Sequence, residues 1–167
     1  PMVVGKMMLE TSKQNAAFET VWSESKYHDR QLYFLKAEGP SSTVGRPGDA
    51  VEYIFSKNKP DFIIMIDAAL KLEGEDSATT AQGYGAAIGG IGTERFQIEE
   101  IASKNNIPVF AIVIKQSIKE AITLMTKEVA DKAEEVRKQV YEMIDENTKE
   151  GQKVLVIGVG NTLGVSQ

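Results

Sequence analysis

A chain of 167 residues suits one domain, and its 42% hydrophobic content is enough for a substantial core. Acidic residues outnumber basic ones, 24 to 19, without a basic cluster, which argues against a nucleic-acid-binding role. The chain has no cysteine, so it has no disulfide and no thiolate metal site, which fits a cytoplasmic protein and also a thermophile. No apolar run reaches the roughly 18 residues that span a membrane, so we expect no membrane segment within this chain.

Hydrophobic periodicity predicts helices and strands in alternation. Helices are expected over residues 2–12, 47–57, 93–105 and 117–147, and strands over residues 31–37, 61–67, 107–114 and 153–159. The polar residues 14–30, with scattered aromatic side chains, are expected to form a connection, or the end of the first helix followed by a loop. This order predicts a single α/β domain over residues 1–167, a three-layer αβα sandwich with a mostly parallel sheet of four to five strands.

The helix predicted over residues 117–147 is the longest element of the chain. Its apolar side chains recur at three- and four-residue steps from Ile118 to Met143, with charged side chains on the other face. We expect this helix to pack on the domain or, alternatively, to mediate homodimerisation.

The two ends of the chain together resemble one strand–turn–helix unit. The last predicted strand runs into a glycine turn with no element after it, and the helix over residues 2–12 has no strand before it. We therefore expect Gln167 to lie near Pro1 and the last strand to be central, as in a circular permutation or a piece cut at this turn. Because the chain starts with Pro1 instead of methionine, we also expect a processed product or part of a longer protein.

Asp67 is the leading candidate for chemistry. It follows the apolar run at residues 62–66, so its carboxylate is expected at the carboxyl end of a buried strand, where open α/β sheets place ligands. Partial desolvation raises the pKa of a carboxyl group and suits acid–base catalysis or metal binding. The alternative is that Asp67 caps the turn that follows the strand.

Three loops are expected to complete a cleft around Asp67. Their candidate ligand-binding residues are Gly160, Asn161 and Thr162 after the last strand, Gly83, Gly85, Gly89 and Gly90 in the glycine-rich loop, and Thr43 and Arg46 in the loop before the second helix. Backbone N–H groups of such turns bind anions, and glycines let a ligand approach closely. Arg46 is expected to pair with Asp67, Asp49 or a substrate carboxylate. No metal site is predicted, and the cofactor stays open.

Two stretches of sequence resemble an uncharacterised archaeal family. The similarity lies in PGDAVEYIFSKNKPDFIIMIDAALKLEGE, at residues 47–75, and GGIGTERFQIEEIA, at residues 89–102. Members of that family are longer chains with an N-terminal membrane segment, and none has an assigned activity. The resemblance implies that this chain is the extramembrane part of such a protein.

A second, more remote resemblance is to the hydrogenase maturation protease fold, which includes the germination protease of spore-forming bacteria. The matching motifs are Val159-Gly160-Asn161, Lys59-Pro60-Asp61 through Ile66-Asp67-Ala68, the glycine loop at 83–92 and Ile107-Pro108-Val109, in family order when the chain is read circularly. The resemblance places one catalytic acid of that family on Asp67. The other acid follows the GN turn, where residues 162–167 contain no carboxylate, and no histidine matches the third metal position.

Three functions are therefore open. The first is a hydrolase related to peptidases that uses Asp67 together with the two glycine turns. The second is a binding module that keeps the cleft without chemistry, for a nucleotide, a peptide or a phosphorylated metabolite. The third is an interaction scaffold that dimerises through the long helix.

Overall fold

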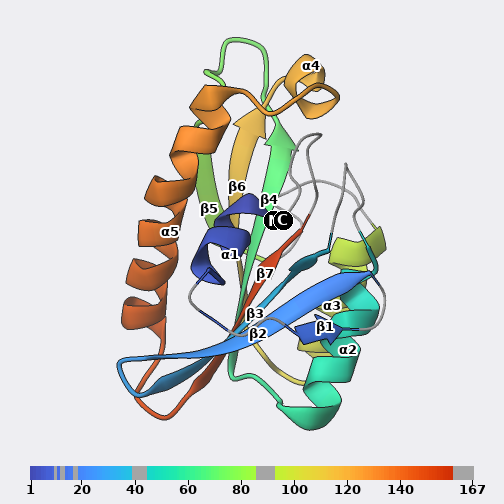
Figure 1. Cartoon of the computed structure of the whole chain (residues 1–167), viewed down its shortest axis with the longest axis vertical. Coiled ribbons are helices and arrows are strands. Elements are labelled where there is room, and N and C mark those ends of the chain that lie inside the picture. The colour runs from blue at the N-terminus through green and yellow to red at the C-terminus, as the bar shows by residue number, and fades with distance from the viewer. Residues whose placement is uncertain (10, 12–13, 17–18, 39–44, 86–92, 160–167) are drawn as a thin grey trace.

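The structure is a computed structural model that describes residues 1–9, 11, 14–16, 19–38, 45–85 and 93–159. Its elements follow in the order α1 (Met2–Met7), β1 (Gln14–Ala16), β2 (Thr20–Tyr27), β3 (Arg30–Ala37), α2 (Pro47–Lys57), β4 (Phe62–Leu70), β5 (Thr80–Tyr84), α3 (Thr93–Lys104), β6 (Val109–Gln116), α4 (Ile118–Ala121), α5 (Lys127–Asn147) and β7 (Lys153–Gly158). Figure 1 shows these elements around one central sheet.

The sheet has seven strands in the order β1-β2-β3-β7-β4-β6-β5. Its centre, from β3 through β7 and β4 to β6, is parallel, and β1, β2 and β5 extend the two edges in the antiparallel sense. The α/β class, the parallel centre and the central position of the last strand are confirmed. The expected count of four to five strands is wrong, because the antiparallel edge strands were not predicted.

The helices cover both faces of this sheet (Figure 1). On one face, α1 and α5 pack on apolar side chains such as Phe34, Ile64 and Val156. On the other face, α2 and α3 pack on the alternating set, which includes Leu35 and Ile63. Because both faces are covered, β4 and β7 are apolar without alternation, as buried parallel strands are expected to be.

The prediction that residues 14–30 form a connection is wrong, because most of this segment belongs to β1 and β2. β2 pairs along its whole length with β3. The tight turn between them has His28 and Asp29 at φ of 42° and 59°, the left-handed conformations that two-residue hairpin turns require. The strand is polar because Glu24 and Lys26 face solvent on alternate positions, which gives it a half-exposed pattern.

A long helix that ends at Asn147 is confirmed, but the prediction that it runs unbroken from residue 117 is wrong. The chain forms the short helix α4 and then restarts at Lys127, where the Thr126 hydroxyl caps α5 by accepting a hydrogen bond from the Val129 N–H. The apolar stripe of α5, from Val129 to Ile144, is buried against the sheet and α1. The part of the predicted apolar stripe that lies on α5 is thus covered within the chain itself, whereas Ile118 and Ile122 at its start are exposed.

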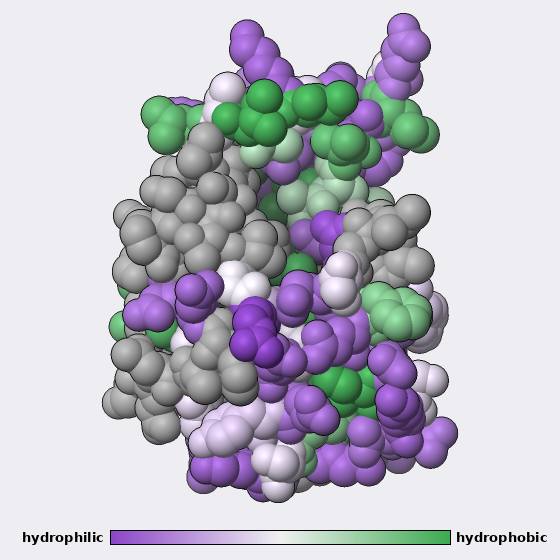
Figure 2. Space-filling view, turned by 90° about the vertical axis from the view of Figure 1, so that its right-hand side faces the viewer, coloured by the Kyte–Doolittle hydropathy of each residue, from purple (hydrophilic) through white to green (hydrophobic). Residues whose placement is uncertain are grey.

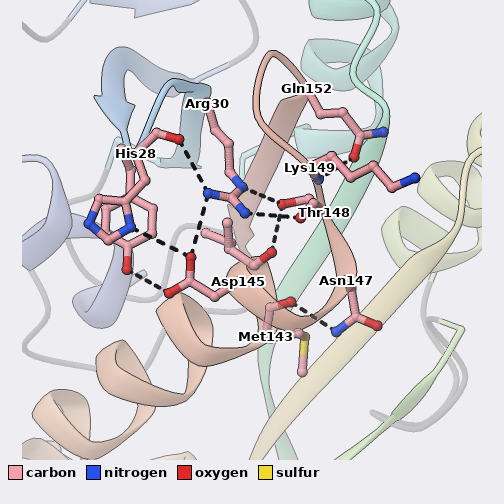
Figure 3. Close-up of polar contacts among 10 residues, drawn as sticks. His28, Arg30, Met143, Asp145, Asn147, Thr148, Lys149 and Gln152 are labelled. Carbon is pink, nitrogen blue, oxygen red and sulfur yellow. Dashed lines mark hydrogen bonds and ion pairs between the residues drawn. The ribbon is translucent and has the colours of Figure 1, made fainter.

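A buried arginine joins the β2–β3 hairpin to the end of α5 (Figure 3). Arg30 donates from Nε to the Thr148 hydroxyl at 2.8 Å and from Nη2 to the Thr148 carbonyl at 2.9 Å. Its Nη1 also lies 3.6 Å from the Asp145 carboxylate. A cation at this position satisfies carbonyl groups at the helix C-terminus and complements the helix dipole.

The first helix and the last strand lie in contact. This agrees with the prediction that the two ends of the chain together resemble one strand–turn–helix unit. Gly158 ends β7 directly beneath α1, and a Cβ atom on Gly158 would lie 2.9 Å from the Pro1 Cα and 3.1 Å from Val4. The expected proximity of Gln167 to Pro1 concerns a residue outside the described ranges.

Candidate functional site

The candidate site lies where the central strand β7 ends before its neighbour β4. Gly158 is the last residue of β7 and stands opposite Ile66, whose carbonyl still accepts a hydrogen bond from the Val159 N–H at 2.8 Å. β4 continues to Leu70 and keeps pairing with β6 on its other side. The β7-facing edge of β4 is therefore left without a strand partner, among the described residues, from Asp67 onward.

Asp67 and Arg95 take the place of that missing strand. Successive odd and even residues of a strand direct their peptide groups to opposite sides, so Ala68 faces the β7 side as Ile66 does. The Ala68 N–H donates to Asp67 Oδ1 at 2.7 Å, and the Ala68 carbonyl accepts from Arg95 Nη2 at 3.3 Å. Arg95 Nε also donates to Asp67 Oδ2 in a salt bridge. The two side chains thus supply hydrogen-bond partners for the N–H and the carbonyl of the half-buried Ala68.

Burial and charge act on Asp67 in opposite directions. The residue is only 5% exposed, and burial raises the pKa of its carboxyl group above the ordinary value. The hydrogen bond and positive charge of Arg95, and the bond from Ala68, work to lower the same pKa but do not reverse its direction. Arg95 comes from the first turn of α3, so the position of this helix determines how strongly the acid is held.

A small pocket of about 50 Å³ opens beside this pair. Its lining residues are predominantly apolar and come from α1, the ends of β4 and β6, and the start of α5; they are Pro1, Met2, Val3, Ile66, Asp67, Ala68, Ile114, Gln116, Met125, Val129 and Val159. Asp67 and Gln116 alone among these carry polar side chains. The pocket therefore offers apolar contact over most of its wall and two polar side chains.

Lys36 is a charged residue of this region that sequence reasoning missed. It lies on β3 opposite Gly158, on the other side of β7 from Ile66, and is only 2% exposed. Its Nζ donates to the Ala37 carbonyl at 2.9 Å. Strand alternation directs Lys36 to the face of α1 and Asp67 to the face of α3. The available signal was a lysine at the carboxyl end of the apolar stretch at residues 32–37, where a buried charge is costly.

Of the predicted site residues within the described ranges, only Asp67 lines this pocket. Gly83 lies on the edge strand β5, opposite Ala111, and Gly85 follows it toward the amino end of β6, away from the ends of β4 and β7. Arg46 precedes α2 and pairs with Asp49, one of the three partners expected for it. The remaining predicted residues, Thr43, Gly89, Gly90, Gly160, Asn161 and Thr162, lie outside the described ranges.

The N-termini of α2 and α3 meet at this end of the sheet. Glu94 of α3 accepts a hydrogen bond from the Gly48 N–H in the first turn of α2 at 2.8 Å, and Gln97 donates to Asp49 at 2.9 Å. The two helices are thereby fixed to one another next to Arg95. In the part of the chain that the structure describes, no group of three or more acidic or histidine side chains is placed to hold a metal ion.

These observations define the class of protein: an α/β domain whose candidate site lies at the carboxyl ends of its parallel strands, the usual ligand position in such sheets. The chain belongs to the family of the C-terminal domain of unknown function DUF1512, whose family model matches residues 1–166. A search among curated proteins finds no match. None of the helices within the described ranges is long and apolar enough to cross a bilayer.

Proposed function

We propose that this domain binds a small ligand in the pocket beside Asp67. The observation that carries the proposal is the pocket itself, an apolar hollow with few polar groups at the carboxyl edge of the parallel strands. Ligand sites of α/β domains have this composition and this position. The expected cytoplasmic location, or an extramembrane location in a longer anchored protein, belongs to the same proposal.

The engagement of Asp67 supports binding over catalysis. Both of its carboxylate oxygens already accept hydrogen bonds, one from Ala68 and one from Arg95. Acid–base hydrolysis of the kind found in the two-carboxylate enzymes needs a second acid facing the substrate. Among the described residues that line the pocket, Asp67 is the sole acid.

A hydrolase related to peptidases is the second candidate. It is favoured by the direction of the Asp67 pKa, which burial raises, because a carboxyl group protonated nearer to neutral pH is a better general acid. The resemblance to the germination protease also places a catalytic acid at this position. The two candidates differ in whether the Asp67 carboxylate is needed for turnover.

The test is a search for bound ligand combined with an activity screen. We expect small molecules released by denaturing the purified protein to raise its melting temperature in proportion to ln(1 + [L]/Kd) when they are added back. Asp67→Asn should change this affinity, whereas Asp131→Asn, a matched change at an exposed position of α5, should not. Peptidase or esterase turnover that Asp67→Asn abolishes would replace binding with the hydrolase, and a ligand shift unaffected by Asp67→Asn and Ala68→Leu would refute this pocket.

A further inference from the structure

Five large apolar side chains are exposed at the end of the molecule next to the pocket. They are Leu70, Leu72, Ile118, Ile122 and Leu124, each between 57% and 72% exposed. Figure 2 shows apolar side chains gathered across the top of this face, with the surface hollowed beneath them. Scattered single apolar residues need no explanation, but a contiguous group of this kind marks a contact with something apolar. We call these five residues the apolar rim.

The apolar rim continues the wall of the pocket. Leu70 follows the pocket residue Ala68 by two positions on β4 and so points to the same face of the sheet. Leu124 precedes the pocket residue Met125, and Ile118 follows the pocket residue Gln116 by two positions.

Hydrogen bonds fix these segments to each other. The Lys71 N–H donates to the Gln116 carbonyl at 2.9 Å, and the Ser77 hydroxyl donates to Glu120 at 2.9 Å. These bonds hold the connection after β4 against α4, so that the rim lies at the mouth of the pocket. The short helix α4 buries none of its own side chains, although its capping box is complete.

We propose that the pocket and the apolar rim form one binding site for the aliphatic chain of a small amphipathic molecule. The inference rests on the proposed ligand-binding function and names the class of ligand. The end of the ligand's aliphatic chain enters the pocket among Val3, Met125 and Val129. The middle of the aliphatic chain lies along the apolar rim, and the polar head of the ligand stays in solvent. A volume of about 50 Å³ is small beside the roughly 300–1,000 Å³ of sites that enclose a whole ligand, so only one end of the ligand is enclosed.

The sheet itself argues against an extended peptide as the occupant. A peptide that binds by strand addition needs a free edge for its backbone hydrogen bonds. β6 has a strand on each side, and β4 has one on each side as far as Ile66. Beyond that residue, the Ala68 peptide groups are already bound by Asp67 and Arg95. An aliphatic chain needs no such partners, because it binds by the removal of apolar surface from water.

Methionine methyl groups offer a direct test. The 167-residue chain would be labelled with carbon-13 at its methionine methyls and titrated with butanol, hexanol and octanol. We expect saturable shifts of Met2 and Met125, which line the pocket, and no shift of Met65, which packs on the opposite face of the sheet. Affinity should rise roughly fourfold for each added methylene, because each buries a similar apolar area.

Two variants localise the binding. Ala68→Leu fills the pocket and should weaken octanol binding by roughly fifteenfold, the equivalent of about two unburied methylenes. Ala69→Leu makes the same change on the opposite face of β4 and should bind as wild type does. Met125→Gln, read from the Met2 methyl, is a second variant that removes apolar contact without adding bulk, and it should also weaken binding.

The outcomes separate the inference from the proposed function. Unsaturable shifts, shifts spread equally over Met65, or equal affinity in Ala68→Leu and Ala69→Leu would overturn the aliphatic-chain site. If alcohols fail in this way but a copurified ligand still shifts Met2 and Met125, the pocket binds a different class and the proposed function stands. If that ligand leaves both methyls unmoved and binds Ala68→Leu normally, the pocket is not the site and both fail. Concentration-dependent self-association that hides the rim would assign it to a second copy and likewise overturn the inference.

Discussion

Asp67 and Arg95 form a salt bridge whose two partners also bind the N–H and the carbonyl of Ala68. The pair therefore has a structural role, because it completes the hydrogen bonding of β4 where β7 ends. Asp67 of this pair also lines the pocket. A ligand that contacts Asp67 would act on the same bonds that attach α3 to the sheet, so binding there is expected to change the contact between α3 and β4.

The first prediction concerns the pH dependence of stability at Asp67. Its folded pKa is raised above the ordinary value of 3.8, so the native state holds this proton longer than the unfolded state does. The protonated Asp67 therefore contributes to the free energy of unfolding in acid, and this contribution is lost as the pH rises from about 4 through the raised pKa. The loss is about 1.4 kcal/mol for each unit by which the folded pKa exceeds the unfolded one. The cost of Asp67→Asn should consequently be largest in acid and should shrink toward neutral pH, as measured by urea unfolding across this range.

An exposed aspartate on α5 provides the control for Asp67. Asp131→Asn, at an exposed site of α5, is the matched control, because it removes a carboxylate that is not buried. A cost of Asp67→Asn that grows with pH would mean that the charge of Arg95 outweighs burial and holds the folded pKa below its ordinary value.

The second prediction concerns the link between the hairpin and α5. Arg30 is 8% exposed and donates two hydrogen bonds to Thr148, so Arg30→Ala should cost about 2–3 kcal/mol in free energy of unfolding. Arg30→Lys should recover only part of this lost stability, because lysine lacks the planar guanidinium group that donates both hydrogen bonds. Chemical denaturation monitored by circular dichroism provides the measurement.

An exposed arginine on α5 is the reference for Arg30. Arg137 pairs with Glu134 on the solvent face of α5, and Arg137→Ala should cost less than about 0.5 kcal/mol. Equal costs for Arg30→Ala and Arg137→Ala would show that the buried contacts of Arg30 do not contribute beyond an ordinary surface pair.

The parts of the fold that sequence predicted are those with a strong local signal. The helix at Pro47–Lys57 was predicted with its observed bounds because proline at its first position and the residues Asn58–Pro60 after it mark both ends. β2 was missed because it pairs through a hairpin turn formed by His28 and Asp29 instead of asparagine and glycine. Such a turn is held by the long pairing of β2 with β3, and this pairing cannot be recognised from the local sequence alone.

The candidate site could be predicted only in part for a similar reason. Asp67 was identified because an acid after an apolar run is visible in the sequence. Its partner Arg95 lies 28 positions away on another element, and only the packing of α3 brings the two together. Gly83 was assigned to the cleft as part of a glycine-rich loop, whereas the strand β5 runs antiparallel to β6 and carries it away from Asp67.

The third prediction follows from the break between α4 and α5. Thr126 caps a helix with six buried side chains, so Thr126→Ala should cost about 1 kcal/mol of global stability. Ser117 caps α4, which buries no side chain, so Ser117→Ala should open α4 locally without destabilising the core. Hydrogen exchange of the two helices, together with urea unfolding, distinguishes these effects. Equal global costs would mean that α4 and α5 unfold as one helix.

The fourth prediction tests the contact between the first helix and the last strand. In Gly158→Ala the new methyl group would lie 2.9 Å from the backbone of Pro1, closer than real Cβ contacts, and 3.1 Å from the Val4 side chain, so α1 must shift. Overpacking of this kind costs about 1–3 kcal/mol. Gly74→Ala serves as the control, since its Cβ atom meets no atom within 4 Å and the variant carries only the backbone strain of a φ of 85°, about 1–2 kcal/mol. Because Pro1, Met2 and Val3 also line the pocket, Gly158→Ala should weaken ligand binding as well as stability, while Gly74→Ala should leave binding unchanged. A Gly158→Ala variant with wild-type stability and wild-type binding would show that α1 does not rest on the end of β7.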